Sequence, residues 1–170
     1  RDNPHTLNKV GLTTKRNLCY THKKRKQIID YHQNKIQNPI INIQTKDTKT
    51  GHNDRFILEK GTPIIARKSN KEKQIYKNEI YYFDGIVDEK VEIHNERNEC
   101  KLEDIDELKT IFCSAYCITI HKSQSQTYRD EYTIHEWKYI SQSKDNFLRL
   151  RYTAMSRSDD YENKVYTRDN

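Results

Sequence analysis

Residues 116–127 read Tyr-Cys-Ile-Thr-Ile-His-Lys-Ser-Gln-Ser-Gln-Thr. An apolar start leads directly into a dense set of hydrogen-bonding side chains, which are costly to bury unless each finds a partner. Lysine and histidine can donate to phosphate oxygens, and the glutamine amides can read the edges of sugars or nucleotides. We therefore interpret this stretch as a candidate site for a phosphate-bearing ligand.

A second stretch, residues 149–157, reads Arg-Leu-Arg-Tyr-Thr-Ala-Met-Ser-Arg. Together the two resemble the last two signature motifs of superfamily 1 DNA helicases, in branch 1B around the RecD-like and mitochondrial-maintenance helicases, with a UvrD-like C-terminal helicase domain. The residues that match are Ala115, Tyr116, Thr119, His121, Lys122, Ser123, Gln124 and Thr127 in the first motif, and Tyr152, Ala154, Ser156 and Arg157 in the second. The two motifs occur in the family's order, which makes the resemblance specific.

The resemblance implies a fold for residues 1–170. It is a second RecA-like domain, an α/β fold of the P-loop NTPase type with a parallel sheet flanked by helices. It also implies a small SH3-like β insertion, which we place at about residues 61–108, where short apolar runs alternate with turns such as Asp84-Gly85. In the family this insertion lies beside the DNA path, and a plain structural hairpin is the alternative.

The resemblance also assigns two residues to the reaction centre. Arg157 matches an arginine that reaches across to the terminal phosphate of ATP, where its guanidinium stabilises charge that develops in the transition state. The alternative is an arginine that only satisfies the C-terminal end of its own helix. Gln124 matches a position close to the nucleotide phosphate.

Five residues of the first motif are expected to contact nucleic acid. Thr119 and His121 match family positions that lie near the DNA backbone or couple it to the nucleotide. Lys122 is either a contact to a backbone phosphate or a solvated charge. Ser123 and Thr127 complete the expected set, and single-stranded DNA is the partner that the resemblance implies.

A third stretch resembles the helicase motif that opens this domain. A short apolar run at residues 17–20 is followed by Thr21, at the position of a helix N-cap, and by a helix predicted over 22–34. In the family a threonine or asparagine and an arginine of this motif approach the nucleotide, so Thr21 and Arg25 are candidate ligands. The alternative for Arg25 is a solvated basic helix face, because residues 22–26 are all basic or histidine.

Ser125 replaces the family's glycine in the first motif, at a position that we also assign to cofactor binding. A glycine there usually means a positive φ or a close approach to a ligand. We expect Ser125 to keep a positive φ under strain, because Gln124 and Thr127 are retained on either side. The alternative is a relaxed loop in which the serine hydroxyl bonds locally and the coupling between nucleotide and DNA is weakened.

One half of an ATP site is missing from the sequence. Such a site needs a Gly-x-x-x-x-Gly-Lys-Ser/Thr loop and an acidic pair for magnesium, but none of the four glycines precedes Lys-Ser or Lys-Thr. We therefore expect ATP and Mg²⁺ to be cofactors of a complete helicase. An N-terminal RecA-like ATPase domain, upstream in the polypeptide or in a separate chain, would hold them, and this chain alone would show no ATPase activity.

Composition agrees with a nucleic-acid partner without requiring one. The net charge is +6, which favours phosphate contacts, although simple solubility is the alternative. The four cysteines form no C-x-x-C pair, so neither zinc nor a disulfide framework is expected. No apolar run approaches the roughly 18 residues of a membrane helix, so we expect a soluble intracellular protein. The phrase Ile-His-Glu-Trp at residues 134–137 resembles helicases of large DNA viruses.

The remaining pattern predicts elements around the motifs. We expect a helix over about 115–124, with Ile111–Cys113 returning to the parallel sheet before it. Strands are predicted at 131–135 and 163–167, and a helix at 146–155, capped by Asp145 and bearing one stripe formed by Leu148, Arg151, Tyr152 and Met155. Trp137 packs in the core or stacks on a base. Two other functions stay open: a non-catalytic nucleic-acid-binding module and a purely structural partner domain.

Overall fold

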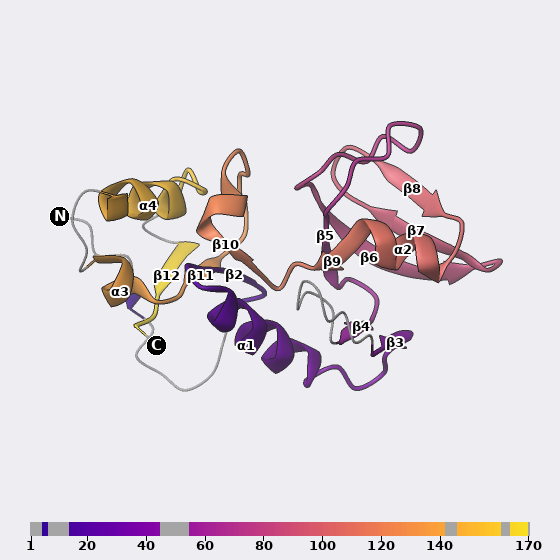
Figure 1. Ribbon diagram of the computed structural model, residues 1–170, viewed down its shortest axis with the longest axis horizontal. Coiled ribbons are helices and arrows are strands. Elements are labelled where there is room, and N and C mark those ends of the chain that lie inside the picture. Colours follow the sequence, from indigo (N-terminus) through magenta and orange to yellow (C-terminus); the bar gives the residue numbers. More distant parts are fainter. Residues whose placement is uncertain (1–4, 7–13, 45–54, 142–145, 161–163, 170) are drawn as a thin grey trace. The chain divides into compact units, whose positions relative to one another are not determined.

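The computed structural model describes residues 5–6, 14–44, 55–141, 146–160 and 164–169 (Figure 1). The chain forms two compact units, and each is described by itself. The first unit joins Arg1–Ile28 to Cys117–Asn170, and the second is Ile29–Tyr116. The helix α1 (His22–Gln33), predicted over 22–34, carries the chain from the first unit into the second.

The first unit is built on a five-stranded sheet in which every neighbouring pair of strands is parallel. The strands, in their order across the sheet, are β1 (His5–Thr6), β12 (Val165–Thr167), β11 (Tyr132–Ile134), β2 (Arg16–Cys19) and β10 (Cys117–Thr119). All residues of β10 and β11 are buried, as in a parallel sheet covered on both faces. With α1, α3 (Trp137–Ser141) and α4 (Asn146–Met155), this confirms the predicted RecA-like α/β fold.

The prediction of a helix over residues 115–124 is wrong. Residues 117–119 form β10, paired with β2 so that Ile118 lies opposite Leu18, and a single turn of 3-10 helix, η1 (Ile120–Ser123), follows. Three consecutive buried residues and the β-branched run from Ile118 to Ile120 favour a covered strand. Thr119, Ser123 and Gln126 consequently do not share one helical face.

The other predicted elements of the first unit are confirmed within a residue or two. The helix expected at 146–155 is α4, and the strands expected at 131–135 and 163–167 are β11 and β12. Asp145, the expected helix cap, lies outside the described residues, as does residue 163. The expected stripe on α4 does not enter the core, since the side chains of Leu148 and Tyr152 are largely exposed.

The second unit contains a five-stranded antiparallel sheet in the order β8-β7-β6-β5-β9. Its strands are β5 (Pro63–Ala66), β6 (Ile80–Val87), β7 (Lys90–His94), β8 (Glu99–Leu102) and β9 (Phe112–Ser114), with α2 (Ile105–Ile111) before β9. A separate antiparallel pair joins β3 (Ile41–Ile43) to β4 (Phe56–Leu58). The core gathers fully buried side chains such as Phe56, Tyr81 and Phe112.

Residues 111–113 do not return to the parallel sheet, so that prediction is wrong. Cys113 lies in β9 and pairs antiparallel with Ile65 of β5, inside the second unit. A short apolar run fits any buried strand, and its pattern does not tell a parallel from an antiparallel neighbour. The turn expected at Asp84-Gly85 is also wrong, because both residues lie inside the single strand β6, where the register shifts between Phe83 and Gly85.

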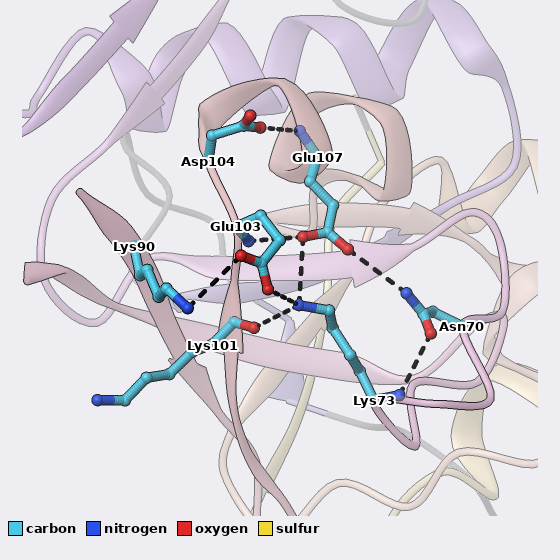
Figure 2. Close-up of polar contacts among 7 residues, drawn as sticks. All are labelled: Asn70, Lys73, Lys90, Lys101, Glu103, Asp104 and Glu107. Atoms are coloured by element: carbon cyan, nitrogen blue, oxygen red, sulfur yellow. Dashed lines mark hydrogen bonds and ion pairs between the residues drawn. The ribbon is translucent and has the colours of Figure 1, made fainter. Parts of the chain in front are cut away.

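A charged network fixes the segment after β5 to the junction of β8 and α2 (Figure 2). The Lys73 ammonium donates to the Lys101 carbonyl at 2.8 Å and contacts Glu103 at 3.1 Å and Glu107 at 3.4 Å. Asn70 Nδ2 donates to Glu107 Oε1 at 3.4 Å. Burial acts to lower the pKa of Lys73, but the hydrogen bonds and charges of the two glutamates outweigh it, and the pKa is raised.

Candidate functional site

Three neighbouring parallel strands end at one edge of the first unit's sheet. Because β2 lies between β10 and β11 and all three run in the same direction, the segments that leave them emerge together. These segments begin at Tyr20, Ile120 and His135. The carboxyl edge of a parallel sheet, where successive connections diverge, is the usual place for a ligand in open α/β folds. The motif at residues 116–127 and the motif that opens the domain, with Thr21 and Arg25, therefore meet at this edge.

Glu136 ties the segment after β11 to the one after β2. Its Oε2 accepts the backbone N–H groups of Tyr20 at 2.8 Å and Thr21 at 2.9 Å, and its Oε1 accepts the Thr21 hydroxyl at 2.7 Å. The same Thr21 oxygen accepts the N–H of Lys24 at 3.2 Å, which confirms the expected N-cap of α1. Glu136 has φ 61°, a conformation that the three hydrogen bonds hold in place.

The turn after η1 explains the conformation of Ser125. Gln124 has φ −56° and ψ 137°, Ser125 has φ 70°, and Gln126 donates its N–H to the Ser123 carbonyl at 3.0 Å. These values define a type II turn, whose third residue needs positive φ and is normally glycine. The expectation of a positive φ at Ser125 is confirmed, and the alternative of a relaxed, ordinary backbone at this residue is excluded.

Arg157 connects the second motif to this turn. Its Nη1 donates to the carbonyls of Ser123 at 3.0 Å and Gln126 at 3.3 Å, its Nε donates to Thr153 at 2.8 Å, and its Nη2 donates to the Ser156 hydroxyl at 3.0 Å. A guanidinium carries five N–H groups, so within the described residues one remains for another acceptor. Arg157 therefore both caps the end of α4 and sets the position of the turn.

Arg25 does not lie on a solvated face. Its side chain is only 7 % exposed, whereas the neighbouring Lys23 and Lys26 are exposed. Burial raises the pKa of the Cys117 thiol well above its usual range, the nearby Cys19 thiol raises it further, and the positive charge of Arg25 acts in the opposite direction. Arg25 is therefore buried, in the first turn of α1, with its charge close to the Cys117 thiol of β10.

The residues of the first motif are divided between the surface and the interior. His121, Gln124 and Thr127 are exposed, and Lys122 is half-buried. The Ser123 side chain is fully buried, and its hydroxyl donates to the Ile120 carbonyl at 2.7 Å. The Thr119 hydroxyl accepts the N–H of Lys122 at 3.4 Å and so begins η1. Only part of the expected set can therefore touch a ligand directly.

A cavity of about 490 Å³ lies along α4, next to the end of the second motif. Its walls include Trp137, Leu148, Arg151, Tyr152 and Met155. Trp137 is half-buried, and the Arg151 guanidinium lies 4.2 Å from the centre of its indole ring, a cation–π contact. The indole therefore neither packs in the core nor offers this face to a base.

Sequence reasoning missed several residues that build the edge. Glu136 could not be found, because a glutamate after a strand carries no signal of the backbone it will bind. Tyr132 donates its hydroxyl to the carbonyls of Ala154 at 2.7 Å and Met155 at 3.0 Å, joining β11 to the end of α4. Tyr20 and Tyr139 were not singled out either, and their rings lie in contact, with centroids 5.6 Å apart.

Two classes of feature are not found in the described part of the chain. No helix there is long and apolar enough to cross a membrane. No group of three or more histidine, cysteine, aspartate and glutamate side chains, again among the described residues, could hold a metal ion.

The solved structures that this chain resembles include three Pif1 structures. The chain resembles Bacteroides Pif1 bound to ssDNA with a TM-score of 0.61 and 16% identity, over 94% of this chain and 41% of that one. The Bacteroides Pif1 helicase in complex with ADP-AlF3 and ssDNA gives 0.59 and 15%, over 95% and 42%. The Pif1 helicase from Candida albicans gives 0.58 and 15%, over 95% and 47%. No family model and no curated protein matches. The chain spans less than half the length of these Pif1 structures, and it shares the fold of the part that it covers.

Proposed function

We propose that this chain is the second RecA-like half of an ATP-dependent DNA helicase. In this role it supplies contacts to single-stranded DNA and the arginine that acts on the terminal phosphate of ATP. The phosphate-binding loop and the magnesium ligands come from an N-terminal RecA-like domain, since the sequence contains neither. The whole protein is then a DNA-stimulated ATPase, and this chain by itself is inactive.

The observation that carries the proposal is the link between the two motifs. Arg157 and the turn at residues 123–126 are more than thirty residues apart in sequence, yet they are joined by two hydrogen bonds. On the same stretch, His121 and Lys122 lie in η1, directly before the turn, and this is where we expect a DNA phosphate to bind. A shift of the arginine towards a phosphate would therefore move the nucleic-acid contacts directly, which is the coupling that a translocating helicase needs.

The residues present fit a nucleotide only in part. Bound ATP would supply the phosphoryl group that is transferred to water. The remaining N–H of Arg157 can donate to one oxygen of the terminal phosphate and stabilise its developing charge. The exposed amide of Gln124 and the hydroxyl of Thr21 lie at the same carboxyl edge. Arg25 contributes a buried positive charge in the first turn of α1. Ser125 contributes the backbone conformation of the turn after η1.

The first experiment measures single-stranded DNA binding by the 170-residue chain as a function of salt. We expect affinity to fall steeply as salt rises, and Lys122→Ala to reduce the slope of log K against log salt by about one unit, because one phosphate contact is lost. Lys60→Ala, an exposed lysine of the second unit, is the control and should leave the slope unchanged. No binding even at low salt would contradict the proposal.

A second candidate function is a nucleic-acid-binding remnant that no longer couples to ATP. The four hydrogen bonds of Arg157 favour it, because they hold the guanidinium on its own chain. Adding the missing ATPase half distinguishes the two. Under the main proposal DNA stimulates phosphate release, and Arg157→Ala lowers turnover by roughly 10³-fold or more. Unchanged turnover in the variant would leave Arg157 with a structural role only.

A further inference from the structure

Three aromatic rings form a row at the carboxyl edge, one from each of the segments that leave β10, β2 and β11. The Tyr20 ring lies in the middle, as β2 lies in the middle of the three strands. Its centroid is 6.3 Å from the His121 ring, edge to face, and 5.6 Å from the Tyr139 ring, tilted by 38°. The row therefore runs across the strands. We name it the aromatic row: His121, Tyr20 and Tyr139.

The row is held in place by the backbone and is open to solvent at its ends. Glu136 fixes Tyr20 by accepting its N–H at 2.8 Å, and Tyr139 lies on α3, which begins directly after Glu136. Tyr139 is 56 % exposed and His121 is exposed as well. Large aromatic side chains left at a surface by a rigid frame lose little conformational entropy on binding a flat partner.

The charges around the row suit a polyanion. Lys122 follows His121 and Lys138 precedes Tyr139, although Lys138 also pairs with Asp169 at 3.0 Å. The Glu136 carboxylate also lies beside the row, and its oxygens accept the three hydrogen bonds from Tyr20 and Thr21. Aromatic faces interleaved with lysines are the arrangement that binds single-stranded nucleic acid, because each base offers a π-face and each linkage a negative charge.

We propose that the aromatic row stacks the bases of the single-stranded DNA whose phosphates Lys122 contacts, with Tyr139 as the outer, base-facing ring. This inference rests on the proposed function and adds base stacking to it. The chain then recognises a strand that has bases, not only a chain of phosphates. Because every base has a π-face, the stacking is independent of sequence.

The test compares two oligonucleotides of equal length by fluorescence anisotropy with the 170-residue chain. One is oligothymidylate, and the other carries abasic sites at every internal position. Stacking contributes about 1–3 kcal/mol per base, so we expect the wild type to bind the thymidine strand about 5- to 150-fold more tightly. Tyr139→Ala should weaken binding of the thymidine strand and so reduce the preference for it, and it should leave abasic binding unchanged, since one of the stacking rings and no charge is removed.

Three controls separate stacking from other effects. Tyr139→Phe keeps the ring and should keep the discrimination, and Tyr152→Ala, which removes a tyrosine 75 % exposed on α4, should change neither affinity. The salt slope of Tyr139→Ala should equal that of the wild type, because the lost group is uncharged. Equal wild-type binding of both strands, or an equal loss on both strands in Tyr139→Ala, overturns the stacking while phosphate binding stands. Failure to bind either strand overturns both proposals.

Discussion

Replacing Ser125 by glycine tests whether the turn after η1 stores strain. Ser125 has φ 70° at the third position of a type II turn. A left-handed conformation costs an L-residue about 1–2 kcal/mol, and glycine removes that cost but loses about 0.5–1 kcal/mol more conformational entropy on folding than other residues. We expect Ser125→Gly to raise the free energy of unfolding by roughly 0.5–1 kcal/mol.

Thermal and urea unfolding measure this effect. For a chain of this length, 1 kcal/mol corresponds to about 2–4 °C in Tm, so the gain in Tm should be about 1–4 °C. Ser125→Ala keeps the same demand on the backbone, and the serine hydroxyl makes no hydrogen bond within the described residues, so the alanine variant should lie within about 0.5 kcal/mol of the wild type. Ser125→Val should be less stable by about 1–3 kcal/mol, because a β-branched residue tolerates positive φ poorly.

The ranking of stability among the wild type and the three variants at residue 125 shows whether the turn is strained. Strain at positive φ requires glycine to be the most stable and valine the least. If the turn instead had an ordinary negative φ in solution, glycine would be destabilising and valine would resemble alanine. That outcome would refute the strained turn and favour the form of the chain that has lost coupling between nucleotide and DNA.

Three further changes have expected outcomes. Arg157→Ala should lower the free energy of unfolding, measured by urea titration, by about 2–3 kcal/mol, because three backbone carbonyls lose a charged donor. A change below about 0.5 kcal/mol would show that these hydrogen bonds are not formed in solution. Burial, aided by Lys35, lowers the pKa of His32 to about 4, below its ordinary value of 6.5, so stability should be constant above about pH 7 and fall as the pH drops from 6.5 to 4. Since the ring is half-buried and solvent partly screens its charge, we expect a loss of about 1–2 kcal/mol, which should be absent from His32→Gln. Lys73→Met should destabilise by about 1–2 kcal/mol and less at high salt, whereas Lys90→Met, whose pair with Glu103 is exposed, should cost under about 0.5 kcal/mol.

The sequence alone specified the elements whose signals are local. The N-cap at Thr21 and the helix after it were predictable, because a threonine before a helical run satisfies an N–H three residues on. The positive φ of Ser125 followed from its place in the motif, since the backbone requirement of a turn is a property of a few adjacent residues. The parallel sheet was implied by the family resemblance that the two motifs carry.

The tertiary structure decided everything that depends on which segment lies beside which. Residues 117–119 are a strand only because β2 lies next to them and pairs with their backbone, which no propensity of a short β-branched run could settle. Phe112–Ser114 joined the antiparallel sheet for the same reason, through β5. The aromatic row and the Glu136 contacts arise where three strands end at one edge, between residues more than a hundred positions apart in the chain. Such contacts depend on strand order and register, and the free energy that selects them is shared by the whole sheet, so no local stretch of sequence contains it.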